Sequence, residues 1–259
     1  GVAAFLTFAA VYHLDLDKMA DAVWATASAT AISEAEGVLA WVKKKRRSTF
    51  GLTDRTYVAC EILKAAWRAA HPAVVALWEA AENAVGGAIQ NPGTTFDAGP
   101  KVRVRVDGAW LRCLLPSGRY VCYLHPRVTD GQLSYMGVNQ YTRQWSRIKT
   151  YGGKLVENWD QAWARDVFAA HAEEVEAAGY LPLIGVHDEW ITETPDTDEY
   201  SGDKLAAIMA RPIDWAPNLP LAAAGFDVGR LEPAELPAAI THVLALDGGR
   251  PIACGPRAT

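Results

Sequence analysis

The 259-residue sequence has few cysteines, no excess of cationic residues and no long apolar run. Its four cysteines are Cys60, Cys113, Cys122 and Cys254. None of them forms a CxxC motif or joins a histidine pattern, which argues against a structural zinc site. The simplest interpretation is a cytoplasmic protein with reduced thiols.

A membrane segment is not indicated by the sequence. The opening residues GVAAFLTFAAVY are apolar, but no basic segment precedes them and they end at His13-Leu14-Asp15. Twelve residues are too few to cross a bilayer, so no membrane partner is expected. Because the chain starts at Gly1 rather than Met, we expect it to be a piece of a longer protein.

The charge and the apolar content bound the class of protein. A formal net charge of −5 argues mildly against nucleic acid as a partner, since nucleic-acid-binding domains are usually basic. An enzyme that acts on nucleic acid can nevertheless concentrate its cations along a groove while its outer surface stays acidic. Half of the residues are hydrophobic, which is enough for a sizeable core. Ten tryptophans must be buried or must stack on a partner.

The order of predicted elements is typical of the α+β class. Helices are expected over residues 15–31, 31–47, 54–70 and 73–90. The pattern then changes to a period of two in Lys101–Val106, and Asp107-Gly108 is a strong hairpin signal. Further strands are expected over 110–115 and 119–124. We therefore divide the chain into a helical segment 1–100, a β-meander insertion 101–149, a segment 150–230 and a tail 231–259.

Residues 150–192 are the most informative stretch. Tyr151-Gly152-Gly153 predicts a backbone break, and Leu155 to about Ala178 predicts one long helix that ends at Gly179. Leu181–Val186 is short and apolar, as expected of a buried strand, and Trp190–Thr192 resumes strand-like chemistry. The intervening His187, Asp188 and Glu189 therefore place two carboxylates at the tip of a hairpin.

The predicted helix carries a stripe of hydrogen-bond donors. Its members, at spacings of 4, 3 and 4, are Lys154, Asn158, Gln161 and Arg165. Side chains at these spacings lie on one narrow helix face. Such donors suit phosphates or the acceptors of bases and sugars. A solvated helix face is the alternative interpretation, because periodicity alone does not determine function.

The string YGGKLVENWDQAWARD, followed by GYLPLIGVHDE, resembles the palm region of family A DNA polymerases, especially phage-type members. The resemblance implies that the His-Asp-Glu turn is the last catalytic motif of that family. By this resemblance Asp188 is a ligand of catalytic magnesium, His187 lies near the primer terminus and Glu189 is an auxiliary carboxylate. Lys154, Asn158 and Gln161 would contact the primer–template duplex in the minor groove, with Arg165 in the same stripe.

Other strings share the resemblance. They are GVAAFLTFAAVY, AAWRAAHPAVVALWEAAENA, LPSGRYVCYLHPRV and SYMGVNQYTRQW. The last string implies nucleic-acid contacts for Tyr141 and Arg143. For Arg119, in the third string, we leave open whether it approaches DNA or nucleotide. The fold implied is a polymerase palm, with an antiparallel sheet, the hairpin and the long helix, plus the helical part of the fingers.

Two expected motifs of the family are missing from this sequence. No Asp-Tyr-Ser string is present, and the cationic nucleotide-binding helix of the fingers has no counterpart. Polymerases of this kind use two magnesium ions about 4 Å apart, normally bridged by two Asp residues from separate strands. We expect this chain to supply only Asp188 and an upstream segment to supply the other ligand. The expected activity is DNA-directed DNA synthesis from primer–template DNA and deoxynucleoside triphosphates, with the isolated chain inactive.

Three alternatives remain beside this hypothesis. A non-catalytic duplex-binding module would need only the stripe and the basic strand at 101–106. A metal-dependent hydrolase built on His187, Asp188 and Glu189 is disfavoured, because adjacent strand residues point to opposite sides. A purely structural α+β domain would make the turn an ordinary polar loop. The cationic run 43–47 is interpreted as a solvated helix end rather than a phosphate contact. The tail 231–259 has no recognised counterpart in the family.

Overall fold

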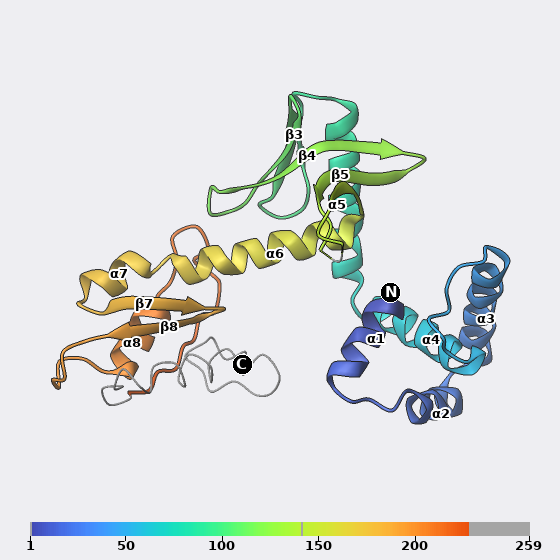
Figure 1. Ribbon diagram of the computed structural model, residues 1–259, viewed down its shortest axis with the longest axis horizontal. Coiled ribbons are helices and arrows are strands. Elements are labelled where there is room, and N and C mark those ends of the chain that lie inside the picture. The colour runs from blue at the N-terminus through green and yellow to red at the C-terminus, as the bar shows by residue number, and fades with distance from the viewer. Residues whose placement is uncertain (1, 141, 228–259) are drawn as a thin grey trace. The chain divides into compact units, whose positions relative to one another are not determined.

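The computed structural model describes residues 2–140 and 142–227 (Figure 1). The chain forms two compact units, Gly1–Trp78 and Glu79–Thr259. The first unit is helical, and the second contains both helices and antiparallel sheets, so the chain is α+β as expected. Along the described residues, no helix has both the length and the apolar character that a membrane span requires.

The first unit contains four helices, three of which begin at a polar cap. Their bounds are α1 (Val2–Val11), α2 (Leu16–Thr26), α3 (Ala29–Lys44) and α4 (Asp54–Ala70). The side chains of Asp15, Ser28 and Thr53 accept backbone N–H groups at the starts of α2, α3 and α4, which satisfies donors that a helix leaves unpaired. Val23, Leu39 and Val58 lie in the core of this unit. The predicted helices 15–31 and 31–47 correspond to α2 and α3, which are shorter and are separated by a break at residues 27–28.

The second unit contains a six-stranded antiparallel sheet in simple meander order. Its strands are β1 (Thr95–Asp97), β2 (Arg103–Asp107), β3 (Trp110–Leu114), β4 (Tyr120–Thr129), β5 (Gln132–Val138) and β6 (Trp145–Thr150). The period of two in β2 is confirmed, because Val104 and Val106 are buried while Arg103 and Arg105 are exposed. The sheet has more strands than the three expected from sequence.

Two helices supply the core beneath this sheet. The inner face of the sheet, with Val104, Leu111 and Cys113, forms one cluster with residues of α5 (Pro72–Gln90) and α6 (Gly152–Ala169). The helices contribute Val85 from α5 and Leu155 and Trp159 from α6. This packing leaves the other face of β2, β3 and β4 turned to solvent.

The sequence predicts a backbone break at 151–153 and one long helix to about Ala178, but the structure has two helices and the first includes Gly152 and Gly153. Tyr151 is the N-cap residue of α6, and the Gly152 N–H donates to the Glu82 carboxylate of α5 at 2.8 Å. The helix ends at Ala169, and α7 (Ala172–Ala177) follows after a break at His171. The buried His171 ring contacts the Arg211 carbonyl oxygen through Nε2 at 3.0 Å, which holds the chain at the break.

The last described part is a hairpin with two short helices. It comprises α7, β7 (Leu181–Val186), β8 (Glu189–Glu193) and α8 (Gly202–Met209). Gly179 has the positive φ of 89° that was predicted for the end of the helical region. Val175, Tyr180 and Leu205 form a small core between α7 and α8. The predicted tail 231–259 lies outside the described residues.

Candidate active site

The predicted donor stripe lies on the surface of α6. Lys154, Gln161 and Arg165 are exposed and Asn158 is half-buried, while Leu155 and Trp159 of the same helix face the core. The side chains of Lys154 and Gln161 form no hydrogen bond or ion pair with any residue in the part of the chain that the structure describes. The two side chains are therefore free to contact a ligand along this helix face.

Asn158 is held by the sheet below it. Its Nδ2 donates to the Tyr123 hydroxyl oxygen at 3.2 Å, and Tyr123 is buried on the inner face of β4. Burial raises the pKa of the Tyr123 hydroxyl, and the Asn158 contact offsets part of that shift. The phenol therefore stays neutral and orients the amide. This positioning contact joins residues 35 apart in sequence, and no local pattern indicates it.

The Phe168 side chain of α6 contacts both Arg165 of the stripe and Trp190 of the hairpin. The Arg165 guanidinium carbon lies 5.0 Å from the centre of the Phe168 ring. The Trp190 ring of β8 stacks on the same Phe168 ring, with centroids 4.5 Å apart. Opposite Trp190 in β7 is Gly185, where an added Cβ would approach the Phe168 ring to 3.3 Å. The hairpin is therefore packed closely against the end of α6.

The tip of the hairpin carries the predicted catalytic residues. Val186 pairs with Glu189, so His187 and Asp188 form a two-residue turn. His187 has a φ of 52°, the left-handed conformation that such tight hairpin turns require and that non-glycine residues adopt at a cost. The side chains of His187 and Asp188 are exposed.

Glu189 differs from Asp188 in its surroundings. Its side chain is half-buried, and this burial raises the pKa of its carboxyl group. The neighbouring Asp188 carboxylate raises the same pKa further, because two like charges repel. A cation bound near the turn would relieve that repulsion.

The residues at the turn fit part of a magnesium site. Magnesium prefers carboxylate oxygens, and it is commonly held by one or two carboxylates together with waters and substrate phosphates. The exposed Asp188 meets that requirement. Within residues 2–140 and 142–227, no group of three or more His, Cys, Asp or Glu side chains is placed to hold a metal ion. The described residues therefore do not supply the complete ligand shell that the hydrolase alternative requires.

Arg119 is engaged within the protein. Its Nε donates to the Asp166 carboxylate at 2.6 Å, and a guanidinium NH₂ group donates to the Ala162 carbonyl oxygen at 2.6 Å. The Ser117 hydroxyl also donates to Asp166. The turn before β4 is therefore tied to α6 through Arg119. These contacts hold the turn on the helix, and they do not test whether Arg119 also approaches DNA or nucleotide.

Of the other two predicted contacts, the structure describes only Arg143. Arg143 lies in the loop between β5 and β6, with an exposed side chain and a φ of 57°. The six residues of β6, about 20 Å of strand, separate this loop from Thr150, where the chain leads into α6. The structure therefore does not bring Arg143 beside Lys154. Tyr141 lies outside the described residues.

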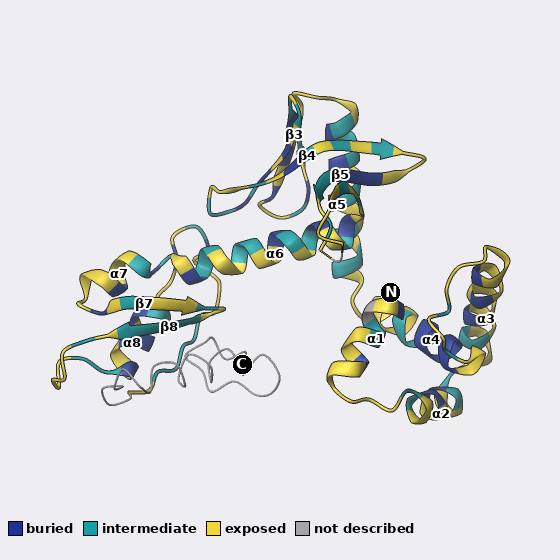
Figure 2. Ribbon diagram, viewed as in Figure 1, coloured by how far each residue is buried: buried dark blue, intermediate teal, exposed yellow. Residues whose placement is uncertain are grey.

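The expectation that β7 is a buried strand is wrong. Figure 2 shows most of this strand as exposed, and Leu181 and Leu183 have 52% and 53% of their surface accessible. The pairing of β7 with β8 has an irregularity between Pro182 and Ile184. The two-stranded sheet has no further strand in the described residues to cover it, so apolar side chains remain at its surface. An exposed apolar strand of this kind is suited to packing against another polypeptide segment.

Comparison with known proteins gives one informative relative. The chain is 36% identical to the DNA polymerase of Bacillus phage SP02 over 179 residues. The aligned region is 64% of this chain and 26% of that polymerase, so the chain spans about a quarter of the relative's length. No family model matches the sequence. No solved structure matches it either.

Proposed function

We propose that this chain is the C-terminal palm, with part of the fingers, of a family A DNA-directed DNA polymerase. Residues 1–100 would belong to the fingers, residues 101–149 to an insertion and residues 150–230 to the palm. Its substrates would be primer–template DNA and deoxynucleoside triphosphates. The similarity to the phage SP02 polymerase supports this class of enzyme.

The observation that carries the proposal is the connection between the donor stripe and the hairpin. The exposed side chains of α6 follow one helix face to Arg165, and the stacked rings of Phe168 and Trp190 join that end of α6 to the hairpin that presents Asp188. A duplex bound along the stripe would therefore lead toward an exposed carboxylate. Lys154 and Arg165 would bind phosphates, and Asn158 and Gln161 would meet minor-groove acceptors.

The chemistry assigned to the turn follows from its residues. Asp188, with its exposed oxygens, would hold catalytic magnesium, and Glu189 would act as an auxiliary carboxylate. In a two-magnesium site, one bound ion would lower the pKa of the primer 3′-hydroxyl and the other would neutralise charge on the leaving pyrophosphate. His187 would contact the primer terminus. Asn158, fixed by Tyr123, would keep the primer strand in register with the turn.

A second carboxylate is needed for two ions, and we place it in an upstream segment of the polymerase. Two features support a second carboxylate from outside this chain. The aligned region is only about a quarter of the phage relative, and β7 exposes the apolar side chains Leu181 and Leu183. An upstream strand packed on β7 would cover those side chains and would bring its own carboxylate to the hairpin.

Primer extension tests the proposal. The isolated chain should show no magnesium-dependent, templated extension, whereas the chain joined to the upstream portion of a phage-type polymerase should extend a primer. In the joined protein, Asp188→Asn should abolish extension. Asp196→Asn, at an exposed aspartate outside the turn, is the matched control and should retain it. Robust synthesis by the isolated chain would contradict the proposal.

A non-catalytic duplex-binding module is the second candidate function. It is favoured by one observation: the donor stripe is contained within this chain, whereas the described residues hold no complete set of metal ligands. Both functions predict salt-dependent binding of duplex DNA that survives Asp188→Asn. Failure of the joined protein to extend a primer, with duplex binding retained, would favour the module.

A further inference from the structure

The outer face of the meander sheet carries an unusual set of side chains. We use the name outer face for Arg103, Arg105, Trp110, Arg112 and Tyr120, which alternate with the buried residues of β2, β3 and β4. Arg105 lies opposite Arg112 in the ladder, and Leu114 lies opposite Tyr120. Residues opposite one another share a face of a sheet, so this face combines cations with aromatic rings.

The two aromatic side chains are open to solvent. Trp110 is 42% exposed and Tyr120 is 51% exposed, while Leu111 and Cys113, which flank Arg112 in the same strand, are buried. On this face, the cross-strand pair Arg112–Cys122 lies between the pairs Trp110–Leu124 and Leu114–Tyr120. Trp110 and Leu114 are four positions apart in β3, which corresponds to about 13 Å along the strand. The order along the sheet is therefore aromatic, cation, aromatic.

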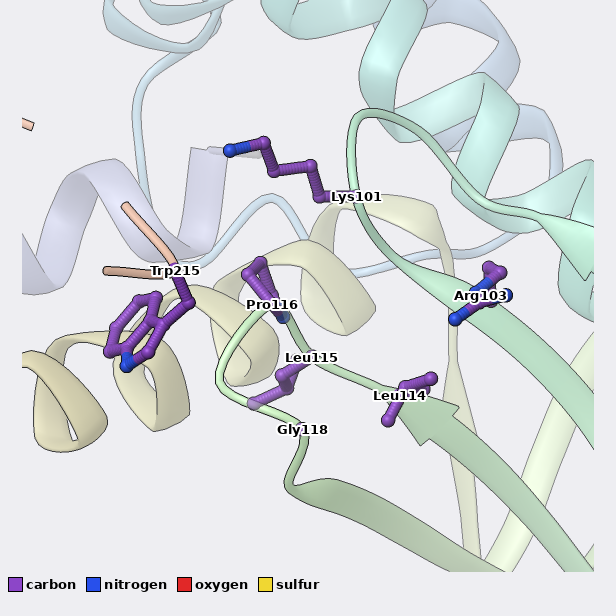
Figure 3. Close-up of a pocket in the computed structure, with 7 residues that line it drawn as sticks. All are labelled: Lys101, Arg103, Leu114, Leu115, Pro116, Gly118 and Trp215. Atoms are coloured by element: carbon purple, nitrogen blue, oxygen red, sulfur yellow. The ribbon is translucent and has the colours of Figure 1, made fainter. Parts of the chain in front are cut away.

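Two hollows are lined in part by side chains of the outer face. One, of about 230 Å³, is lined by Trp110, Arg112, Tyr120 and Cys122. The other, of about 420 Å³, is lined in part by Lys101, Arg103, Pro116 and Trp215 (Figure 3). Leu114 of the second hollow lies directly opposite Tyr120 of the first, so the two hollows adjoin.

The cations of this surface outnumber its carboxylates, which are Asp107 and, opposite Arg103 in the ladder, Asp97. Arg105 is bound to Asp107 at 2.7 Å, but Lys101, Arg103 and Arg112 have no ion pair or hydrogen bond from their side chains to any other described residue. In a chain with a net charge of −5, three such cations beside two exposed rings form a local site for an anionic and aromatic ligand. Nucleic acid combines both properties.

We propose that the outer face, together with Lys101, binds single-stranded DNA. Lys101, Arg103 and Arg112 contact phosphates, and unpaired bases stack on Trp110 and Tyr120. A single strand fits better than a duplex, because bases inside a duplex are already stacked and cannot cover a protein ring. This surface involves neither α6 nor Asp188, so the inference goes beyond the proposed polymerase site. In a polymerase, the strand available for such binding is the unpaired template.

Fluorescence anisotropy with the full chain tests the proposal. The probes are a fluorescein-labelled oligo(dT) of 20 nucleotides and a labelled duplex of 20 base pairs. Trp110→Ala and Tyr120→Ala should each weaken oligo(dT) binding about tenfold or more, while Tyr120→Phe should bind like the unmodified chain. Arg112→Gln should reduce the slope of log K against log salt by about 0.7.

Matched controls separate this surface from the α6 stripe. Trp41→Ala, at an exposed tryptophan of the first unit, should leave oligo(dT) binding unchanged. Lys154→Ala should weaken duplex binding and spare oligo(dT) binding. Circular dichroism verifies the fold of each variant. Equal oligo(dT) affinities for the unmodified chain and a folded Trp110→Ala/Tyr120→Ala double variant would overturn the proposal, whether or not the joined polymerase is active.

A chemical footprint gives an independent readout. Cys122 is exposed in the first hollow, opposite Arg112, whereas Cys60 and Cys113 are buried. In a Cys254→Ser background, iodoacetamide should alkylate Cys122, and oligo(dT) should slow that reaction several-fold at saturating concentration. Peptide mass spectrometry identifies the modified site. An unchanged alkylation rate with oligo(dT) bound would place the DNA elsewhere and would contradict the proposal.

Discussion

The Phe168 ring of α6 and the Trp190 ring of β8 stack nearly parallel, with planes 17° apart and centroids separated by 4.5 Å. This contact joins the helix that carries the donor stripe to the hairpin that carries Asp188. Phe168 is buried, and Gly185 of β7, which lies opposite Trp190, leaves room for the Phe168 ring because it has no side chain. The placement of the turn relative to α6 therefore depends on the packing of these two rings.

Removing the Phe168 ring should destabilise the second unit. Phe168→Ala is expected to lower the free energy of unfolding by about 3 kcal/mol, because a buried aromatic side chain is lost and a cavity remains. Urea denaturation followed by circular dichroism measures the change. Phe8→Ala, at an exposed phenylalanine of α1, should cost well under that amount. Equal effects of the two substitutions would show that Phe168 does not hold the hairpin on α6.

Lys154 should contribute to duplex binding through its charge. Lys154→Ala is expected to weaken binding of a 20-base-pair duplex several-fold and to reduce the salt slope by about 0.9, because one phosphate contact is lost. Titrations at several salt concentrations measure both quantities. Lys18→Ala is the control, since Lys18 is a highly exposed lysine of the first unit. Equal salt slopes for the two variants would remove Lys154 from the interface.

Arg119 should matter for stability rather than for DNA. Arg119→Ala removes the ion-pair partner of Asp166, whose side chain is only 12% exposed and keeps the Ser117 hydroxyl as a donor. The substitution also leaves the Ala162 carbonyl oxygen without the Arg119 donor. We expect a loss of about 1–3 kcal/mol in the free energy of unfolding, with duplex affinity per folded molecule unchanged. A large loss of duplex affinity in a fully folded Arg119→Ala protein would instead make Arg119 a DNA contact.

The carboxyl of Glu189 should make stability depend on pH. Its pKa in the folded state is raised, chiefly by burial and further by Asp188, so the folded chain holds this proton more tightly than the unfolded chain. The resulting contribution to stability is present at low pH and is lost as pH rises through the folded pKa. Glu189→Gln should therefore flatten the pH dependence of stability above the ordinary glutamate pKa.

Asp188→Asn provides a direct measurement on the same carboxyl group. Without the neighbouring negative charge, the pKa of Glu189 should fall toward its ordinary value and remain above it, because burial persists. Carbon-13 NMR titration of the Glu189 carboxyl measures this shift. A pKa that stays unchanged in Asp188→Asn would mean that the two carboxyl groups do not interact.

The parts of the fold predicted from sequence are those set by local periodicity. The donor stripe, the hairpin turn and the alternation in β2 follow from spacings of three and four or of two, which neighbouring residues determine. The helix break after Ala169 depends instead on His171 and the carbonyl of Arg211, 40 residues away. The role of Arg119 likewise depends on Asp166, 47 residues away. Neither distant partner can be identified from local sequence patterns.

Two further differences arose because composition does not determine which face is covered. Leu181–Val186 is apolar enough for a buried strand, but burial requires a neighbouring element, and the described sheet contains only β7 and β8. In β6 the sequence pattern is weaker than the structure. Its sequence WSRIKT has little apolar alternation and does not predict a strand, but β6 pairs with β5 along its whole length.

The central claim is that Asp188 is a catalytic magnesium ligand at the end of a duplex-binding helix. The most direct test is magnesium-dependent primer extension by the chain joined to an upstream polymerase portion, with duplex binding measured on the same samples. The account predicts that Asp188→Asn abolishes extension and leaves duplex affinity unchanged, while Asp196→Asn alters neither. Extension by Asp188→Asn at the rate of the unmodified joined protein would contradict it.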